Sequence, residues 1–293
     1  MSRDPNHDYK SRCIYHITIG KVPSCPDFSQ ISGSAEDPIV KRSPIGRIIK
    51  AQIDNFPNLC PHLRILQDII MPDHIHFAIF AQEYLPYAIG RYIGMMKVKC
   101  GQLIRERFPE VTDIFTPDFH DRYLRRYHSL PAIIEYIKQN PGRLQARRQN
   151  PGFFMKINNF TIGNSLWQAY GNLQLLENPF KAPVVIHRAD SSSILLEKET
   201  HWKYLAENGG VLVSPFISPC EKEVRRRCED VNGKIILLSN RPFGEREKPA
   251  NHDFGQCSQG RLLIIAPMAP LIPGRATFLY LNSIAEYLSL TRP

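Results

Sequence analysis

The chain of 293 residues is 43% hydrophobic and 22% charged, a globular composition with enough material for two domains. No stretch reaches the length of a membrane span, because Pro267 and Pro270 interrupt the most apolar segment, and the polar first ten residues predict no secretory signal. We therefore expect a cytoplasmic protein without a membrane partner. Its seven cysteines are scattered and form no Cys-x-x-Cys pair, which favours reduced thiols over a disulfide framework or a zinc site.

The net charge of +9 is uneven, with +6 in residues 1–150 and +3 in residues 151–293. Between positions 122 and 148 the sequence has one glutamate and seven basic residues, namely Arg122, Arg125, Arg126, Lys138, Arg143, Arg147 and Arg148. Such a local surplus indicates a polyanionic partner, most economically nucleic acid. Charge alone leaves a solvated helix face as an equal alternative.

Apolar periodicity and turn residues predict an alternating order of strands and helices in the first half. The expected elements are a strand at 14–19, a long loop at 20–44, a helix at 45–56, strands at 63–70 and 74–81, a helix at 86–108, a short strand near 123–124 and a helix from an N-cap at Ser129 to Asn140-Pro141-Gly142. The order β-α-β-β-α-β is that of an α+β ferredoxin-like domain with an antiparallel sheet, which we place at residues 10–150.

Two pairs of polar residues stand out in these elements. His74 and His76 project from the same face of their strand, because side chains alternate with a period of two, and two imidazoles can offer two nitrogens to one divalent ion. Tyr136 and Asn140 are four apart on the last helix and share a face. A His-x-His pair by itself is more often two half-exposed histidines on an ordinary strand.

Both pairs lie in segments that together resemble a known family. The segments are Met71-Pro72-Asp73-His74-Ile75-His76 and Glu135-Tyr136-Ile137-Lys138-Gln139-Asn140-Pro141. They resemble the single-tyrosine HUH transposases, most closely the REP-associated tyrosine transposase branch, over roughly residues 10–148. The resemblance implies that His74, His76 and Asn140 hold a divalent metal, Mg²⁺ or Mn²⁺, and that Tyr136 attacks DNA.

The resemblance also implies the reaction and its partner. Tyr136 would cleave and rejoin single-stranded DNA, with a hairpin in the strand, through a 5′-phosphotyrosine intermediate. Phosphates would follow the arginines Arg122, Arg125, Arg126, Arg143, Arg147 and Arg148. The 20–44 insertion is not a feature that the resemblance explains, and whether the chain forms a homodimer stays open.

Two other functions fit the same residues. A non-catalytic protein that binds single-stranded DNA or hairpin RNA would keep the basic face and use His74 and His76 for packing. A metal phosphodiesterase with water as the nucleophile would not need Tyr136.

The second half predicts short apolar strands that alternate with helices, as in a parallel sheet. We expect strands at 184–186, 211–213, 235–238 and 262–265 and helices at 191–207, 219–231 and 277–288, in an α/β Rossmann-like domain at residues 171–293 after an irregular boundary. Asn208-Gly209-Gly210 and Ser214-Pro215-Phe216 fall at strand ends, where such sheets bind ligands. No Gly-x-Gly-x-x-Gly or Walker loop is present, so a structural or protein-contact module is an equally good interpretation.

Overall fold

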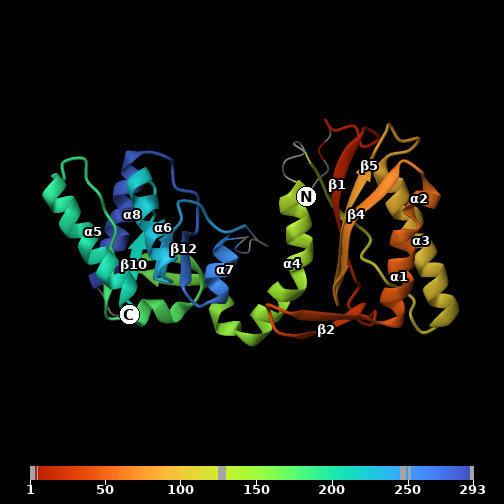
Figure 1. Ribbon diagram of the computed structural model, residues 1–293, viewed down its shortest axis with the longest axis horizontal. Helices are drawn as coiled ribbons and strands as arrows, with labels where there is room; N and C mark the ends of the chain where they lie inside the picture. Colours follow the sequence, from red (N-terminus) through yellow and green to blue (C-terminus); the bar gives the residue numbers. More distant parts are fainter. Residues whose placement is uncertain (1–3, 5, 125–129, 245–248, 250–251, 291–293) are drawn as a thin grey trace. The chain divides into compact units, whose positions relative to one another are not determined.

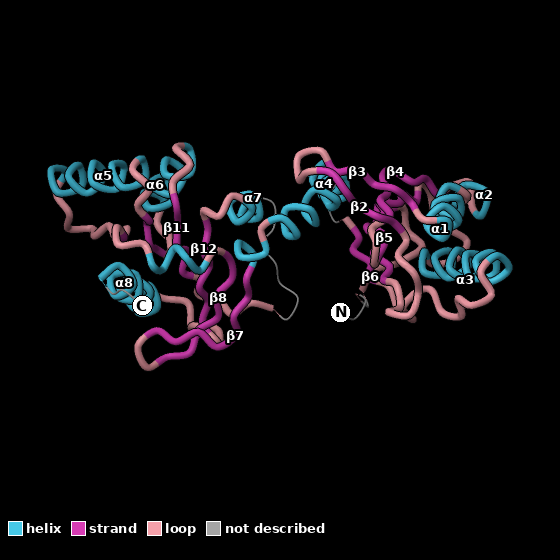
Figure 2. Tube along the Cα trace, turned by 90° about the horizontal axis from the view of Figure 1, so that it is seen from below, coloured by secondary structure: helices cyan, strands magenta, loops and turns pink. Residues whose placement is uncertain are grey.

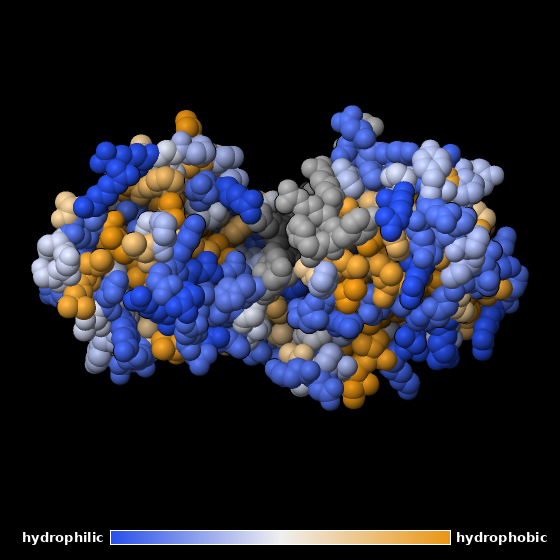
Figure 3. Space-filling model, turned by 45° about the horizontal axis from the view of Figure 1, so that its top comes forward, coloured by the Kyte–Doolittle hydropathy of each residue, from blue (hydrophilic) through white to orange (hydrophobic). Residues whose placement is uncertain are grey.

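The computed structural model describes residues 4, 6–124, 130–244, 249 and 252–290 of the chain (Figure 1). The chain divides into two compact units, Met1–Ala146 and Arg147–Pro293. Each unit has its own sheet and its own buried apolar residues. None of the helices in the described ranges combines the length and apolar character needed to cross a membrane. Hydrophilic side chains cover much of the face drawn in Figure 3, with apolar side chains exposed between them.

The first unit contains a four-stranded antiparallel sheet in the order β4-β5-β1-β6. Its strands are β1 (Cys13–Gly20), β4 (Leu63–Ile70), β5 (His74–Ala81) and β6 (His120–Tyr123). Three helices pack on one face, α1 (Pro44–Asp54), α2 (Phe56–Leu59) and α3 (Ile89–Arg107). Figures 1 and 2 both show α4 (Leu130–Gln149) on the opposite side of the sheet. The antiparallel sheet expected for this half is confirmed.

The core of the first unit explains which face of β5 is left for a site. Ile75, Phe77 and Ile79 are fully buried among the residues that α1 and α3 contribute to the core. Side chains on a strand alternate between its two faces, so His74 and His76 point away from this core, toward the side of α4.

The segment predicted as a long loop contains a β-hairpin, so this expectation was wrong. β2 (Ser29–Gly33) pairs antiparallel with β3 (Pro38–Arg42). The hairpin packs against α4, where the Gln145 side-chain amide donates to the Gly33 carbonyl at 2.8 Å. The Pro, Ser and Gly content that suggested a loop belongs to the turns, whereas Ile31 is buried.

The end predicted for the last helix of this half was also wrong, because α4 continues to Gln149 with Pro141 inside it. Proline removes one backbone hydrogen bond and usually ends a helix. Here packing outweighs that loss, since Asn140, Pro141 and Gly142 are buried. A Cβ on Gly142 would lie 2.3 Å from the Ala35 carbonyl oxygen, so the hairpin approaches this glycine closely. The N-cap expected at Ser129 lies outside the described residues.

The second unit contains a six-stranded mixed sheet in the order β7-β8-β12-β11-β10-β9. Its four parallel strands are β9 (Lys181–Pro183), β10 (Val211–Ser214), β11 (Lys234–Leu238) and β12 (Leu262–Pro267). The antiparallel strands β7 (Met155–Ile162) and β8 (Ser165–Gly171) extend the sheet from β12, with η2 (Pro151–Phe154) before them and η3 (Leu173–Glu177) after them. The stretch expected as an irregular boundary is therefore part of this sheet.

Helices of the second unit cover both faces of its sheet. One set of buried residues joins the sheet to α5 (Ser192–Glu207), α6 (Pro219–Asp230) and α7 (His252–Ser258), and another joins it to α8 (Arg275–Leu290). Ser191 and Ser218 cap α5 and α6 through their hydroxyl oxygens. The parallel pairing expected for this half is present, in a mixed α/β unit. The first strand was expected at 184–186, which was wrong, because the residues that pair with β10 are Lys181–Pro183.

Candidate metal and nucleophile site

The two histidines of β5 are held side by side by the strand that pairs with theirs. In the register of β1 and β5, Thr18 lies opposite His76 and Gly20 opposite His74. His76 is 6% exposed, and the side chain of His74 is 25% exposed. A strand paired on both sides and anchored by a buried face is a rigid support for these imidazoles.

The Nε2 atoms of His74 and His76 lie 3.0 Å apart. Nδ1 of His74 is 2.7 Å from Asp73 Oδ1, and because an ionised carboxylate only accepts, Nδ1 donates its proton there. In the neutral ring, Nε2 of His74 then presents its lone pair toward His76. A carboxylate behind an imidazole in this way is a common support for a metal-binding histidine.

The second ring is held from its other nitrogen. Nδ1 of His76 lies 2.8 Å from Thr18 Oγ1 and 3.2 Å from His16 Nε2. Burial, followed by the neighbouring histidines His74 and His16, lowers the pKa of His76 to about 2, so this ring is neutral at physiological pH. Burial and the charge of Arg122 lower the pKa of His16 to about 4.

This arrangement fits a divalent ion. Two ligands at right angles, each about 2.1 Å from an octahedral ion, are about 3.0 Å apart, which matches the separation of the two Nε2 atoms. The Thr18 hydroxyl can donate to Nδ1 of His76 or accept from it, so His76 can present a lone pair at Nε2 without moving. The described residues contain no group of three or more His, Cys, Asp or Glu side chains suited to a metal, so a third ligand drawn from these residues would be of another type.

Helix α4 brings Tyr136 to the histidines. The centroid of its half-buried ring lies 5.7 Å from that of His76 and 5.8 Å from that of His16, edge-on to both. The buried Asn140 follows one turn later, and its amide donates to the Tyr136 carbonyl at 2.7 Å. The structure thus brings His74, His76 and Tyr136 together, with Asn140 tied to the backbone of the tyrosine.

The arginines proposed to follow the phosphates have different surroundings where the structure describes them. Arg122 is exposed on β6, opposite His16 in the register. Arg143 is 7% exposed, and its guanidinium lies 5.3 Å from the centre of the Tyr136 ring. Arg147 belongs to the second unit, where its guanidinium lies 5.7 Å from the Phe254 ring, and Arg148 is exposed beside it. Arg125 and Arg126 lie outside the described residues.

His16, Thr18 and Asp73 were not predicted from the sequence as residues of the site. The signal was present, since His16 and Thr18 sit two apart in the predicted first strand, with the same spacing as His74 and His76. Their role depends on the pairing of two distant strands, which a pattern within one strand does not reveal. Arg143 was selected for phosphates, whereas the structure places it against the tyrosine.

Comparison with known proteins finds distant likenesses. No protein-family model matches the chain. An uncharacterised protein of Haemophilus influenzae is 23% identical over 156 residues, which cover 46% of this chain and 84% of that protein. A solved structure of a REP-associated tyrosine transposase bound to a REP hairpin covers 48% of this chain and 73% of its own, with 15% identity and a TM-score of 0.35. A candidate transposase of Deinococcus radiodurans covers 47% and 96%, with 14% identity and a TM-score of 0.28. These likenesses do not assign the chain to a family, so its function has to follow from the site.

Proposed function

We propose that the first unit cleaves and rejoins single-stranded DNA by metal-assisted transesterification, with Tyr136 as the nucleophile. The observation that carries this proposal is the pair of Nε2 atoms 3.0 Å apart, beside a tyrosine ring whose centroid is 5.7 Å from that of His76. A carboxylate and a hydroxyl hold the far nitrogens of both rings.

In the proposed step, the Tyr136 oxygen forms a bond to a backbone phosphorus of the DNA. The bond from phosphorus to the 3′-oxygen breaks, the 3′-oxygen takes up a proton and the phenol loses one, so no net proton is exchanged. The products are a 5′-phosphotyrosine and a free 3′-hydroxyl. Because the phosphodiester energy is kept in the tyrosyl bond, the reverse attack rejoins a strand without nucleotide fuel.

The chain's own residues bind and orient the reactants. His74, His76 and the side-chain oxygen of Asn140 would hold the metal, Mg²⁺ or Mn²⁺. When bound, such an ion polarises the phosphate and lowers the energy of the charge that develops on it. Asp73 and Thr18 orient the imidazoles of His74 and His76. Arg122 is exposed and would bind a phosphate of the DNA strand.

We propose a fold for each of the two units. Strand order β4-β5-β1-β6, with α1 and α3 on one face, supports a ferredoxin-like first unit. We propose a Rossmann-like class for the parallel part of the second unit. The hairpin-bearing substrate follows from the sequence resemblance alone, and a cytoplasmic location remains an expectation.

Labelled DNA distinguishes the proposal from its alternatives. A single strand that bears a hairpin is incubated with the full chain and Mg²⁺ or Mn²⁺, and the products are separated on a denaturing gel. Covalent capture of the 5′ end predicts that a 3′-labelled strand labels the protein, whereas a 5′-labelled strand gives only a shorter fragment. Shortened fragments without labelled protein would indicate hydrolysis, and binding without cleavage would indicate a non-catalytic protein.

A matched pair of histidine variants tests the metal ligands. His76→Ala should abolish the labelled protein and the binding of Mn²⁺, because one of two adjacent nitrogens is removed. His62→Ala is the control, since His62 is partly exposed and pairs with Glu83 away from the site. If both variants lost labelled protein and Mn²⁺ binding equally, the effect would not be specific to the pair of His74 and His76.

A further inference from the structure

The second unit contains a cavity of 530 Å³ at the carboxyl ends of its parallel strands. It is lined by residues that directly follow β10 and β11, among them Phe216, Ser239 and Arg241, and by Lys222 of α6 and Phe278 of α8. This edge is where open α/β sheets bind ligands, and the volume lies within the about 300–1,000 Å³ typical of small-molecule sites. Ser214-Pro215-Phe216 was expected at this edge, whereas Asn208-Gly209-Gly210 precedes β10 and lies at the other end.

Aromatic rings provide the apolar part of the lining. Tyr170 and Phe243 both line the cavity and meet edge to face, with centroids 6.4 Å apart. Phe216 adds a third ring from the loop after β10. Flat apolar surfaces of this kind suit a planar ring in the ligand.

The charges around the cavity favour an anion. Lys222 and Arg241 both line it, and Asp253 is the acidic side chain among the lining residues. The Asp253 carboxylate is compensated, because it pairs with Arg225 at 2.5 Å. Lys222 is exposed and has no ion-pair partner among the described residues. A cation held at a concave surface without a carboxylate partner attracts anionic ligands.

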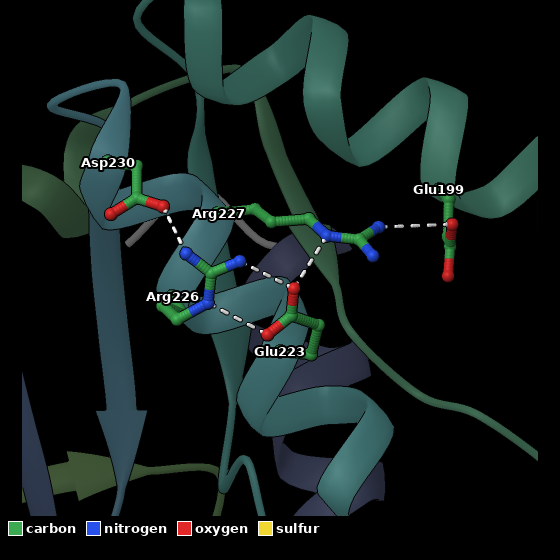
Figure 4. A network of polar contacts seen from close by, with 5 residues as sticks. All are labelled: Glu199, Glu223, Arg226, Arg227 and Asp230. Carbon is green, nitrogen blue, oxygen red and sulfur yellow. Dashed lines mark hydrogen bonds and ion pairs between the residues drawn. The ribbon is translucent and has the colours of Figure 1, made fainter.

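The other basic residues of α6 show that this lack of a partner is specific to Lys222. Arg226 pairs with Glu223 and Asp230, and Arg227 pairs with Glu223 and Glu199 of α5 (Figure 4). These ion pairs lie within α6 and between α6 and α5, and they compensate the charge of both arginines.

The loop after β10 is held in an unusual conformation beside the cavity. Phe216 has a φ of 46°, in the left-handed region that bulky residues rarely adopt. Its N–H donates to Ser214 Oγ at 3.0 Å, and that hydroxyl donates to the Val184 carbonyl at 2.8 Å. Strained residues that are fixed by their surroundings in this way concentrate at functional sites.

Three N–H groups at the start of α6, those of Ile217, Ser218 and Glu221, already have hydrogen-bond acceptors. The Glu221 carboxylate accepts from Ile217 at 3.0 Å and from Ser218 at 2.9 Å. The side chains available to bind an anionic group are those of Lys222 and Arg241, the cations that line the cavity.

We propose that this cavity binds a nucleotide, with the base against the aromatic rings and the phosphates at Lys222 and Arg241. A nucleotide combines the planar ring and the anionic group that the lining suits. The site belongs to the second unit and does not depend on the activity proposed for the first.

Calorimetric titration of the full chain tests the site with four probes: ATP, AMP, adenosine and inorganic phosphate. ATP and AMP should bind, with adenosine and phosphate each at least about tenfold weaker, because each keeps only half of the recognised chemistry. Absence of heat with both nucleotides, or phosphate binding as tightly as AMP, would overturn the proposal.

Charge-removing variants locate the binding. Lys222→Gln and Arg241→Gln should each weaken ATP binding about tenfold, since each removes a charge-assisted contact. Lys203→Gln is the control, because Lys203 is exposed on α5 and does not line this cavity. Affinity that is unchanged in both cavity variants would place any nucleotide elsewhere and contradict the assignment.

Discussion

Gly142 in α4 and Gly94 in α3 are helical glycines for which the same substitution should have opposite effects. Ala at 142 would place a Cβ 2.3 Å from the Ala35 carbonyl oxygen, whereas ordinary contacts begin near 3.4 Å, so backbone has to move by about 1 Å. Such overpacking costs about 3 kcal/mol, against about 1 kcal/mol gained from helix propensity. A Cβ at Gly94 meets nothing within 4 Å, so Gly94→Ala keeps only the gain.

We therefore expect Gly142→Ala to lower the free energy of unfolding by about 2 kcal/mol and Gly94→Ala to raise it by up to about 1 kcal/mol. Far-ultraviolet circular dichroism during urea titration measures the change. Both tryptophans, Trp167 and Trp202, belong to the second unit, so their fluorescence reports that unit and should be the same in both variants. Two glycine variants of equal stability would refute the close approach of the hairpin to α4.

Three further substitutions give distinct outcomes. Ser218→Ala removes the cap of α6 and should destabilise the second unit by about 1 kcal/mol, read from tryptophan fluorescence in urea; an unchanged midpoint would contradict the capping interaction. Arg122→Ala should lower the salt dependence of single-strand binding by about 0.7 in the log–log slope, and an unaltered slope would place the DNA elsewhere. Asn140→Ala should weaken Mn²⁺ binding and slow the formation of labelled protein without abolishing it, and full activity would remove Asn140 from the ligand set.

Local sequence patterns were sufficient to predict the position of some helices and strands. β5 begins at His74 and α6 at Pro219 as predicted, and the helix expected at 191–207 is α5, because alternation and helical periodicity are properties of the segment itself. The β2–β3 hairpin and the continuation of α4 through Pro141 were missed. Both are stabilised by contacts between segments more than 100 residues apart, such as that of Gln145 with Gly33.

In the candidate site, too, contacts between segments distant in the sequence could not be predicted from local patterns. His74 and His76 could be predicted as neighbours because two residues on one strand face are close in any fold. Thr18 contacts His76 only through the register of β1 and β5. Arg143 lies against Tyr136 because α4 continues past Pro141, which places residues seven apart on one helix face. Positive charge in the sequence predicts a polyanionic partner, whereas the position of each arginine depends on strand pairing and on the course of α4.

Covalent attachment of Tyr136 to DNA distinguishes the proposed reaction from hydrolysis and from binding alone. Tyr136→Phe removes one oxygen and keeps the ring that lies beside His76 and His16, so the fold and Mn²⁺ binding should persist. With a 3′-labelled hairpin-bearing strand and Mn²⁺, the unmodified chain should carry the label on the peptide that contains Tyr136, identified by mass spectrometry. Tyr136→Phe should carry none. Label that persists in Tyr136→Phe, or that maps to another peptide, would contradict the central claim that this tyrosine is the nucleophile.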